Sequence, residues 1–131
     1  MDTITVKTSS RIQFVDITSD IRRIVEKRGL TDGIAMVYVP HTTAGITINE
    51  AADPDVVSDL NNKLSQLIPC ETMYRHAEGN SDAHIKASLM GSSVQIIISD
   101  SKLVLGVWQG VFFCEFDGPR TRKVHVKLIS C

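Results

Sequence analysis

Apolar side chains recur along this chain at two spacings, one typical of strands and one typical of helices. Stretches that alternate between apolar and polar residues, and short apolar runs bounded by turn residues, predict β-strands. The predicted strands cover residues 3–14 with a break near 9–10, and then 34–40, 45–49, 94–98, 103–105, 111–116 and 121–129.

Two other stretches carry apolar residues three and four positions apart, as expected of amphipathic helices, and a third, shorter helix is predicted from the residues at its ends. Residues 18–28 form the first, with Gly29 ending it, and residues 83–90 form the short third helix, with Ser81 as its predicted N-cap and Gly91 after its end. Both ends of the third helix therefore carry residue types that suit a helix terminus.

The longest predicted helix opens at Asp53-Pro54 and ends before Pro69. Aspartate caps a helix N-terminus well, and proline fits the first helical position because its missing N–H would have no partner there. The apolar stripe of this helix is expected to cover one face of a sheet.

Strands with a few helices inserted, rather than a regular strand–helix–strand repeat, indicate the α+β class with largely antiparallel sheets. The chain has 131 residues, which is long enough for one domain with a hydrophobic core and short for two, so residues 1–131 are predicted to form a single domain. Hydrophobic residues make up 43% and charged residues 22%, the composition of a soluble globular protein.

Charge and cysteine content narrow the possible partners and location. A net charge of −1 favours neither nucleic acid nor a membrane surface as a partner. The longest apolar runs, such as residues 96–98, are too short to span a bilayer, and the N-terminus does not resemble a signal peptide. Cys70, Cys114 and Cys131 are scattered, which argues against a disulfide framework or a thiolate zinc site. A cytoplasmic location is therefore expected.

The densest polar chemistry lies in residues 76–84, which read His-Ala-Glu-Gly-Asn-Ser-Asp-Ala-His. Glycine and asparagine accept a positive φ most readily, and the serine and aspartate that follow suit a helix N-terminus. We expect this loop-to-helix junction to form a polar pocket for a metal ion, an anionic ligand or both. The loop of residues 70–80 is longer than a connection requires, and Met73 and Tyr74 are expected to anchor it.

Three histidines, His41, His76 and His84, come from places that the predicted fold can bring together. A zinc ion is commonly held by two or three imidazoles, whereas magnesium prefers oxygen ligands. Spacing alone leaves two interpretations open, a shared metal site or separate hydrogen-bonded histidines. His76 and His84 flank the acidic and amide side chains of the junction, which favours the metal interpretation for that pair.

An anion site is the second hypothesis, because backbone N–H groups of a turn that enters a helix can cradle phosphate. The candidate donors are side chains at turns and strand ends, namely Thr42, Thr43, Asn80, Ser81 and Arg120. The alternative is that Ser81 only caps its helix and that Arg120 pairs with Asp117 or Glu115.

Carboxylates next to the histidines are candidates for proton transfer. Glu78 and Asp82 can move a proton together with His84, or orient a histidine. Asp53 is better explained as a helix cap, and Cys114 lies in an apolar strand and is expected in the core.

Five well-separated motifs resemble the YjbQ family, whose members are also called secondary thiamine-phosphate synthase enzymes. The motifs are Pro-His-Thr-Thr-Ala-Gly at 40–45, Asn-Glu at 49–50, the junction extended to 74–86, Gly-x-Trp-Gln at 106–109 and Glu-x-Asp-Gly-Pro-Arg-x-Arg at 115–122. The resemblance covers essentially the whole chain, and it implies a compact α+β domain with a β-sandwich character that assembles as a homotrimer.

The same resemblance implies a low-specificity enzyme that acts on phosphorylated small molecules. Its reaction joins a pyrimidine methyl diphosphate to a thiazole phosphate and releases pyrophosphate. Histidines 41, 76 and 84 would hold a divalent metal (zinc or magnesium) near subunit contacts, and the five donors named above would hold phosphate oxygens. The competing hypothesis is a non-catalytic trimer that captures a metal or a phosphometabolite.

Overall fold

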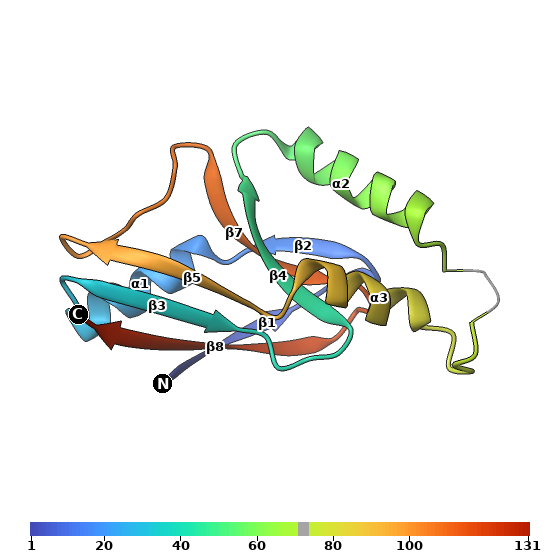
Figure 1. The fold of residues 1–131 in the computed structure, drawn as a ribbon, viewed down its shortest axis with the longest axis horizontal. Coiled ribbons are helices and arrows are strands. Elements are labelled where there is room, and N and C mark those ends of the chain that lie inside the picture. The colour runs from blue at the N-terminus through green and yellow to red at the C-terminus, as the bar shows by residue number, and fades with distance from the viewer. Residues whose placement is uncertain (71–73) are drawn as a thin grey trace.

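A computed structural model describes residues 1–70 and 74–131 and arranges them as two antiparallel sheets and three helices (Figure 1). In chain order the elements are β1 (Asp2–Lys7), β2 (Gln13–Asp16), α1 (Thr18–Arg28), β3 (Gly33–Tyr38), β4 (Ala44–Glu50), α2 (Pro54–Leu67), α3 (Ser81–Met90), β5 (Ser93–Ser99), β6 (Lys102–Leu103), β7 (Gln109–Glu115) and β8 (Thr121–Ser130).

Strand pairing confirms the predicted α+β class with antiparallel sheets. The larger sheet has the order β1-β8-β3-β5-β6, the smaller has the order β2-β7-β4, and neighbouring strands in both run antiparallel. The break predicted near residues 9–10 separates β1 from β2, and these two strands belong to different sheets. The N-terminal segment therefore contributes an edge strand to each layer.

The smaller sheet is buried on both faces, which explains why β7 is nearly continuously apolar. Val111 and Phe113 face the main core between the two sheets, while Phe112 and Cys114 face a second cluster on the other side. Cys114 is fully buried, as predicted, and burial raises the pKa of its thiol. This cysteine is therefore a core residue and not a nucleophile.

Helices α1 and α3 cover opposite sides of this arrangement. Ile21 and Val25 of α1 join the main core, whereas Ala83 and Ala87 of α3 join the second cluster. Figure 1 shows α1 behind the larger sheet and α3 alongside β4. Helix α3 packs closely against β4, and its small side chains Ala83 and Ala87 join the second cluster.

The start of α3 differs by two residues from the prediction. The helix begins at Ser81, so Asn80 and not Ser81 occupies the N-cap, and no side chain bonds to the N-terminal amides there. Gly79 adopts the predicted positive φ of 79°. Since glycine has no Cβ, it allows the chain to turn sharply into the helix.

Helix α2 only partly covers a sheet, in contrast to its predicted role. Asp53 caps it as expected, with Oδ1 accepting from the Asp55 amide at 2.9 Å. Val57 and Leu64 pack against the second cluster, but no residue of α2 is fully buried and Leu67 is 66% exposed. The apolar stripe was identified correctly, but this chain leaves much of it uncovered.

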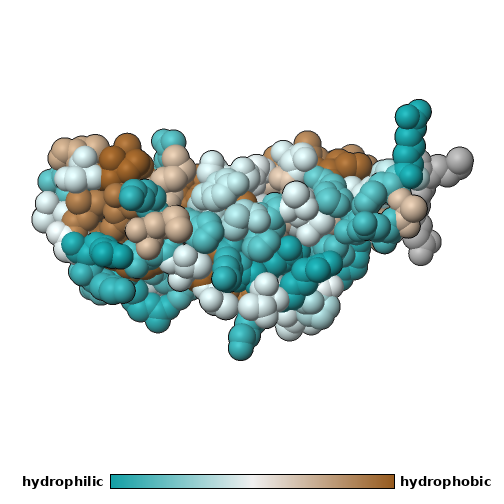
Figure 2. Space-filling view, turned by 90° about the horizontal axis from the view of Figure 1, so that it is seen from below, coloured by the Kyte–Doolittle hydropathy of each residue, from teal (hydrophilic) through white to brown (hydrophobic). Residues whose placement is uncertain are grey.

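Figure 2 shows hydrophobic side chains gathered at the end of the molecule where β5 and β6 meet. Within residues 1–70 and 74–131, no helix combines the length and apolar character needed to cross a membrane.

Candidate functional site

A polar hollow of about 480 Å³ lies between the start of β4 and helix α3. Polar side chains from both elements and from the turns beside them border it: His41, Thr42, His84, Ser88 and Ser92. The structure thus brings His41 and His84, two of the three histidines that the sequence analysis places in one site, to one open cavity.

A glycine contact holds the two walls of this hollow together. The Ile46 amide donates to the Gly91 carbonyl at 3.1 Å, which joins β4 to the end of α3. A Cβ on Gly45 would lie 2.8 Å from that same carbonyl and 2.9 Å from Cβ of Met90. Because only glycine fits this close approach, Gly45 fixes the distance between the strand and the helix that carries His84.

A second hollow, of about 390 Å³, lies on the other side of His84. It is bordered by the end of the loop and the first turns of α3: Tyr74, Arg75, His76, Ser81, His84 and Ile85. The hydroxyl of Tyr74 donates to the Pro69 carbonyl at 2.7 Å, which confirms this tyrosine as a loop anchor. Met73, the other predicted anchor, lies outside the described residues.

The two junction histidines stand edge to face. The ring centroids of His76 and His84 are 5.4 Å apart, with an interplanar angle of 88°. Oε1 of Glu78 lies 3.8 Å from Nε2 of His76, and both side chains are substantially exposed. Glu78 is therefore placed to orient or neutralise His76 once that imidazole is protonated.

His84 borders both hollows, whereas His41 and His76 each border one. Among the described residues, no group of three histidine, cysteine, aspartate or glutamate side chains is close enough to hold a metal ion. His41 is also already engaged, since its Nε2 accepts from the backbone amide of Lys123 at 3.0 Å. A three-histidine metal site thus stays a prediction, with His76 and His84 as the pair that the fold places together.

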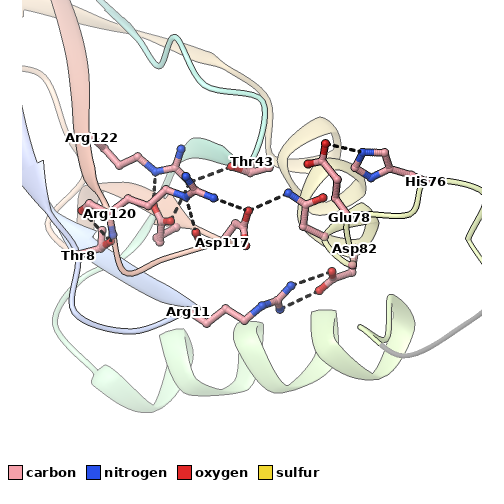
Figure 3. A network of polar contacts seen from close by, with 12 residues as sticks. Thr8, Arg11, Thr43, His76, Glu78, Asp82, Asp117, Arg120 and Arg122 are labelled. Atoms are coloured by element: carbon pink, nitrogen blue, oxygen red, sulfur yellow. Dashed lines mark hydrogen bonds and ion pairs between the residues drawn. The ribbon is translucent and has the colours of Figure 1, made fainter.

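Two predicted phosphate ligands, Asn80 and Arg120, meet at the carboxylate of Asp117, and Figure 3 shows the contact of Arg120 with it. Nδ2 of Asn80 donates to Oδ2 of Asp117 at 2.9 Å, and Nη2 of Arg120 donates to the same oxygen at 3.1 Å. Nε of Arg120 also donates to the Asp117 carbonyl at 2.8 Å. Of the two alternatives left open for Arg120, pairing with Asp117 is the one that the structure contains.

Asp82, a proposed proton-transfer residue, is fully buried beneath the junction. Both its oxygens accept from the Arg11 guanidinium, at 2.9 and 3.0 Å, and Nζ of Lys86 lies 3.5 Å from Oδ2 (Figure 3). Burial alone would raise the pKa of Asp82, but Arg11 and Lys86 outweigh it and hold this pKa below its usual value of 3.8. The carboxylate therefore stays ionised and ties helix α3 to the segment between β1 and β2.

Thr43 belongs to a buried ion pair that joins the two sheets. Arg122 of β8 donates from Nε and Nη2 to the carboxylate of Glu115 on β7, at 2.6 and 2.8 Å, and Nη2 also donates to Oγ1 of Thr43 at 2.9 Å. Glu115 is 0% and Arg122 5% exposed. The Thr43 hydroxyl is thus held in place beside the first hollow, while its neighbour Thr42 is exposed.

Sequence reasoning gave no site role to three residues of this network, Arg11, Glu115 and Arg122. The partners are distant in sequence, with 71 residues separating Arg11 from Asp82 and 79 separating Thr43 from Arg122. The one local signal is the four-residue spacing of Asp82 and Lys86, which places both on the same side of a helix.

The chain matches a family model described as "UPF0047 protein YjbQ-like" over residues 2–131. It is 58% identical to the UPF0047 protein MJ1081 of Methanocaldococcus jannaschii over 125 residues, covering 95% of this chain and 91% of that one. It is 46% identical to the UPF0047 protein YugU of Bacillus subtilis over 131 residues, covering 99% of each.

Solved structures agree with the observed fold. A protein of Clostridium acetobutylicum, described as an uncharacterised conserved member of the YjbQ/UPF0047 family, superposes with a TM-score of 0.97 at 57% identity, covering 98% of this chain and 100% of that one. A YbjQ-like protein of unknown function from Sulfolobus solfataricus gives a TM-score of 0.95 at 33% identity, covering 99% and 96%. The arrangement of two sheets and three helices is thus shared with these proteins.

Proposed function

Because this chain belongs to the UPF0047 family of YjbQ-like proteins, we propose that it is a low-specificity enzyme that acts on phosphorylated small molecules, in the manner of a secondary thiamine-phosphate synthase. The observation that supports this most is the open hollow of about 480 Å³ between His41, Thr42 and His84. Cavities of roughly 300–1,000 Å³ with a few converging polar groups are typical of small-molecule sites.

The proposed reaction requires hydrogen-bond donors that stabilise the negative charge developing on pyrophosphate as it leaves. Hydroxyl and imidazole groups border the hollow, and the first amides of α3 lack partners within the helix because of helix geometry. In this proposal Thr42 and Ser81 donate to phosphate oxygens. Arg120 and Asn80 join them when a phosphate competes with Asp117 for their donors, and Thr43 keeps the strand end in position through its bond to Arg122.

The carboxylates take different parts in this proposal. Glu78, which is exposed beside His76, orients that imidazole or accepts a proton through it. Asp82 is a positioning residue, because its contacts with Arg11 and Lys86 fix helix α3, which carries His84. His84 borders both hollows, and the proposal gives it one of two roles at the reacting centre, as a cation ligand or as the group that moves a proton.

A divalent cation is part of the proposal at the His76–His84 pair. Two imidazoles suit zinc better than magnesium, which prefers oxygen ligands. Among the described residues no third histidine, cysteine, aspartate or glutamate joins this pair closely enough to hold the ion, so the remaining ligands would come from solvent, substrate or another subunit. A cation bound there would supply positive charge for a phosphate group.

Self-association as a homotrimer is also proposed, from the family resemblance. Exposed apolar side chains support it: Ile97 is 62%, Val104 52% and Ile129 46% exposed. We expect light scattering coupled to size exclusion to give three times the mass of the 14.4 kDa chain. A monomeric mass at micromolar concentration would contradict this part of the proposal.

The test of the enzymatic proposal is pyrophosphate release from a pyrimidine methyl diphosphate and a thiazole phosphate, measured with and without added zinc. Replacing His84 with alanine should lower the rate by about 10²-fold, the cost of removing one group that stabilises developing charge. His125→Ala is the matched control, because that histidine bonds to Thr3 on the larger sheet and borders neither hollow. No release by the native protein, or equal rates in the two variants, would reject the proposal.

A further inference from the structure

The ring of His41 is held in one tautomer by a backbone amide. Nε2 of His41 lies 3.0 Å from the amide nitrogen of Lys123, on the neighbouring strand β8. A backbone N–H can only donate, so Nε2 must be the bare, accepting nitrogen. A neutral imidazole whose Nε2 is bare carries its proton on Nδ1.

The surroundings of His41 favour this neutral form. Partial burial lowers the pKa of His41, and the Arg122 guanidinium acts in the same direction. The backbone contact with Lys123 and the Glu115 carboxylate act in the opposite direction, His125 adds to the lowering, and the net result is a pKa of His41 below its usual value. The ring therefore presents an uncharged N–H at neutral pH.

The Nδ1–H group of His41 is available to donate to a ligand. His41 borders the first hollow together with Thr42 and His84, and among the described residues the hydrogen bond that its ring makes is the one at Nε2. We propose that His41 is a binding residue of this site, whose Nδ1–H donates to an oxygen of a phosphate or pyrophosphate group in the hollow. The inference rests on the proposed function, because it names the atom that would recognise the anionic part of that substrate.

The same tautomer separates His41 from any metal. A metal ligand must offer a bare ring nitrogen, but Nε2 is occupied by the Lys123 amide and Nδ1 carries the proton. To bind a cation through Nε2, His41 would have to lose the hydrogen bond from the Lys123 amide of β8. The structure thus assigns His41 to the anion, leaving His76 and His84 for the cation.

Nitrogen NMR of the full chain labelled with ¹⁵N-histidine tests the tautomer without any variant. Long-range ¹⁵N–¹H correlations should show a protonated Nδ1 and a bare Nε2 for His41 at neutral pH. Added zinc should leave both resonances in place, while added pyrophosphate should shift the Nδ1 resonance. A proton on Nε2, or resonances that move with zinc, would overturn the inference.

Two isosteric variants test the donor itself, with inorganic pyrophosphate as the probe in calorimetry. In His41→Asn the side-chain amide lies near the position of Nδ1 and can still donate to the phosphate group. In His41→Gln the amide reaches the position of Nε2, so it keeps the contact with Lys123 but has no donor at the position of Nδ1. Pyrophosphate affinity should fall about 10-fold or more in His41→Gln, as expected for a lost bond to a charged group, and within about 3-fold in His41→Asn. Zinc stoichiometry should be the same in both.

The outcomes separate this inference from the proposed function. If the native protein binds pyrophosphate and His41→Gln binds it equally well, the donor role is wrong while the proposed function survives. A loss of zinc in both variants would also overturn the inference, because it would make His41 a metal ligand. If the native protein binds no pyrophosphate, both proposals fail.

Discussion

Replacing Glu115 with alanine should lower the free energy of unfolding by about 3–5 kcal/mol, because it leaves the Arg122 guanidinium buried without its carboxylate. Arg122 is only 5% exposed, and it would keep a single bond to Thr43. Urea denaturation followed by circular dichroism measures the change. We expect the larger sheet and the smaller sheet to lose stability together, since this ion pair joins them.

The double variant Glu115→Leu, Arg122→Met is the control for that experiment. The double variant removes both charges and fills a similar volume, so it should be much less destabilised than Glu115→Ala. The loss of unfolding free energy in Glu115→Ala would then be due to the unpaired buried charge of Arg122. A loss below about 1 kcal/mol in Glu115→Ala would mean that water reaches Arg122 and would contradict its burial.

Replacing Asp82 with alanine should cost a similar amount, about 3–5 kcal/mol, because Lys86 is 1% exposed and has Asp82 as its ion-pair partner in the described chain. Asp20→Ala is the matched control. Asp20 pairs with Arg23 on the exposed face of α1, and surface pairs of this kind are worth less than about 1 kcal/mol.

The effect of Asp82 should depend on pH in a defined direction. The folded protein holds the pKa of Asp82 below its usual value, so the stability that this carboxylate contributes is complete above about pH 4 and is lost as the pH falls through the folded pKa. The difference in unfolding free energy between native protein and Asp82→Ala should therefore shrink in acid. A difference that stays constant down to pH 2 would show that Asp82 is not ionised in the fold.

Local patterns predicted most of the secondary structure correctly. The first helix ends at Gly29, which adopts the left-handed conformation, and the second begins at Asp53-Pro54 as its cap chemistry requires. These features depend on interactions within a few residues. The predicted start of α3 is two residues late. Serine and asparagine are both good N-caps, and the side chain of Asn80 bonds not to the helix but to Asp117, which is distant in sequence and which no local pattern indicates.

Local sequence patterns do not predict which segments distant in the chain come into contact. The sequence indicates that Asp82 and Arg120 lie in or near the junction. Nothing in the neighbouring residues indicates that Arg11 pairs with Asp82, or that Asp117 pairs with Arg120. The uncovered stripe of α2 was missed for a similar reason. Periodicity shows that a helix has an apolar face, but it does not show how much of that face the same chain will cover.

Strand β8 lies between β1 and β3 in the larger sheet, and Asp2 pairs with Val126. Strand β1 leaves the ribosome long before β8, and it has no neighbour in the sheet until β8 has been made. Contacts this far apart in sequence make folding slow and leave unpaired edges exposed in the meantime. During synthesis, β1 and β3 should remain open to chaperones or to misassembly until residues 121–130 emerge.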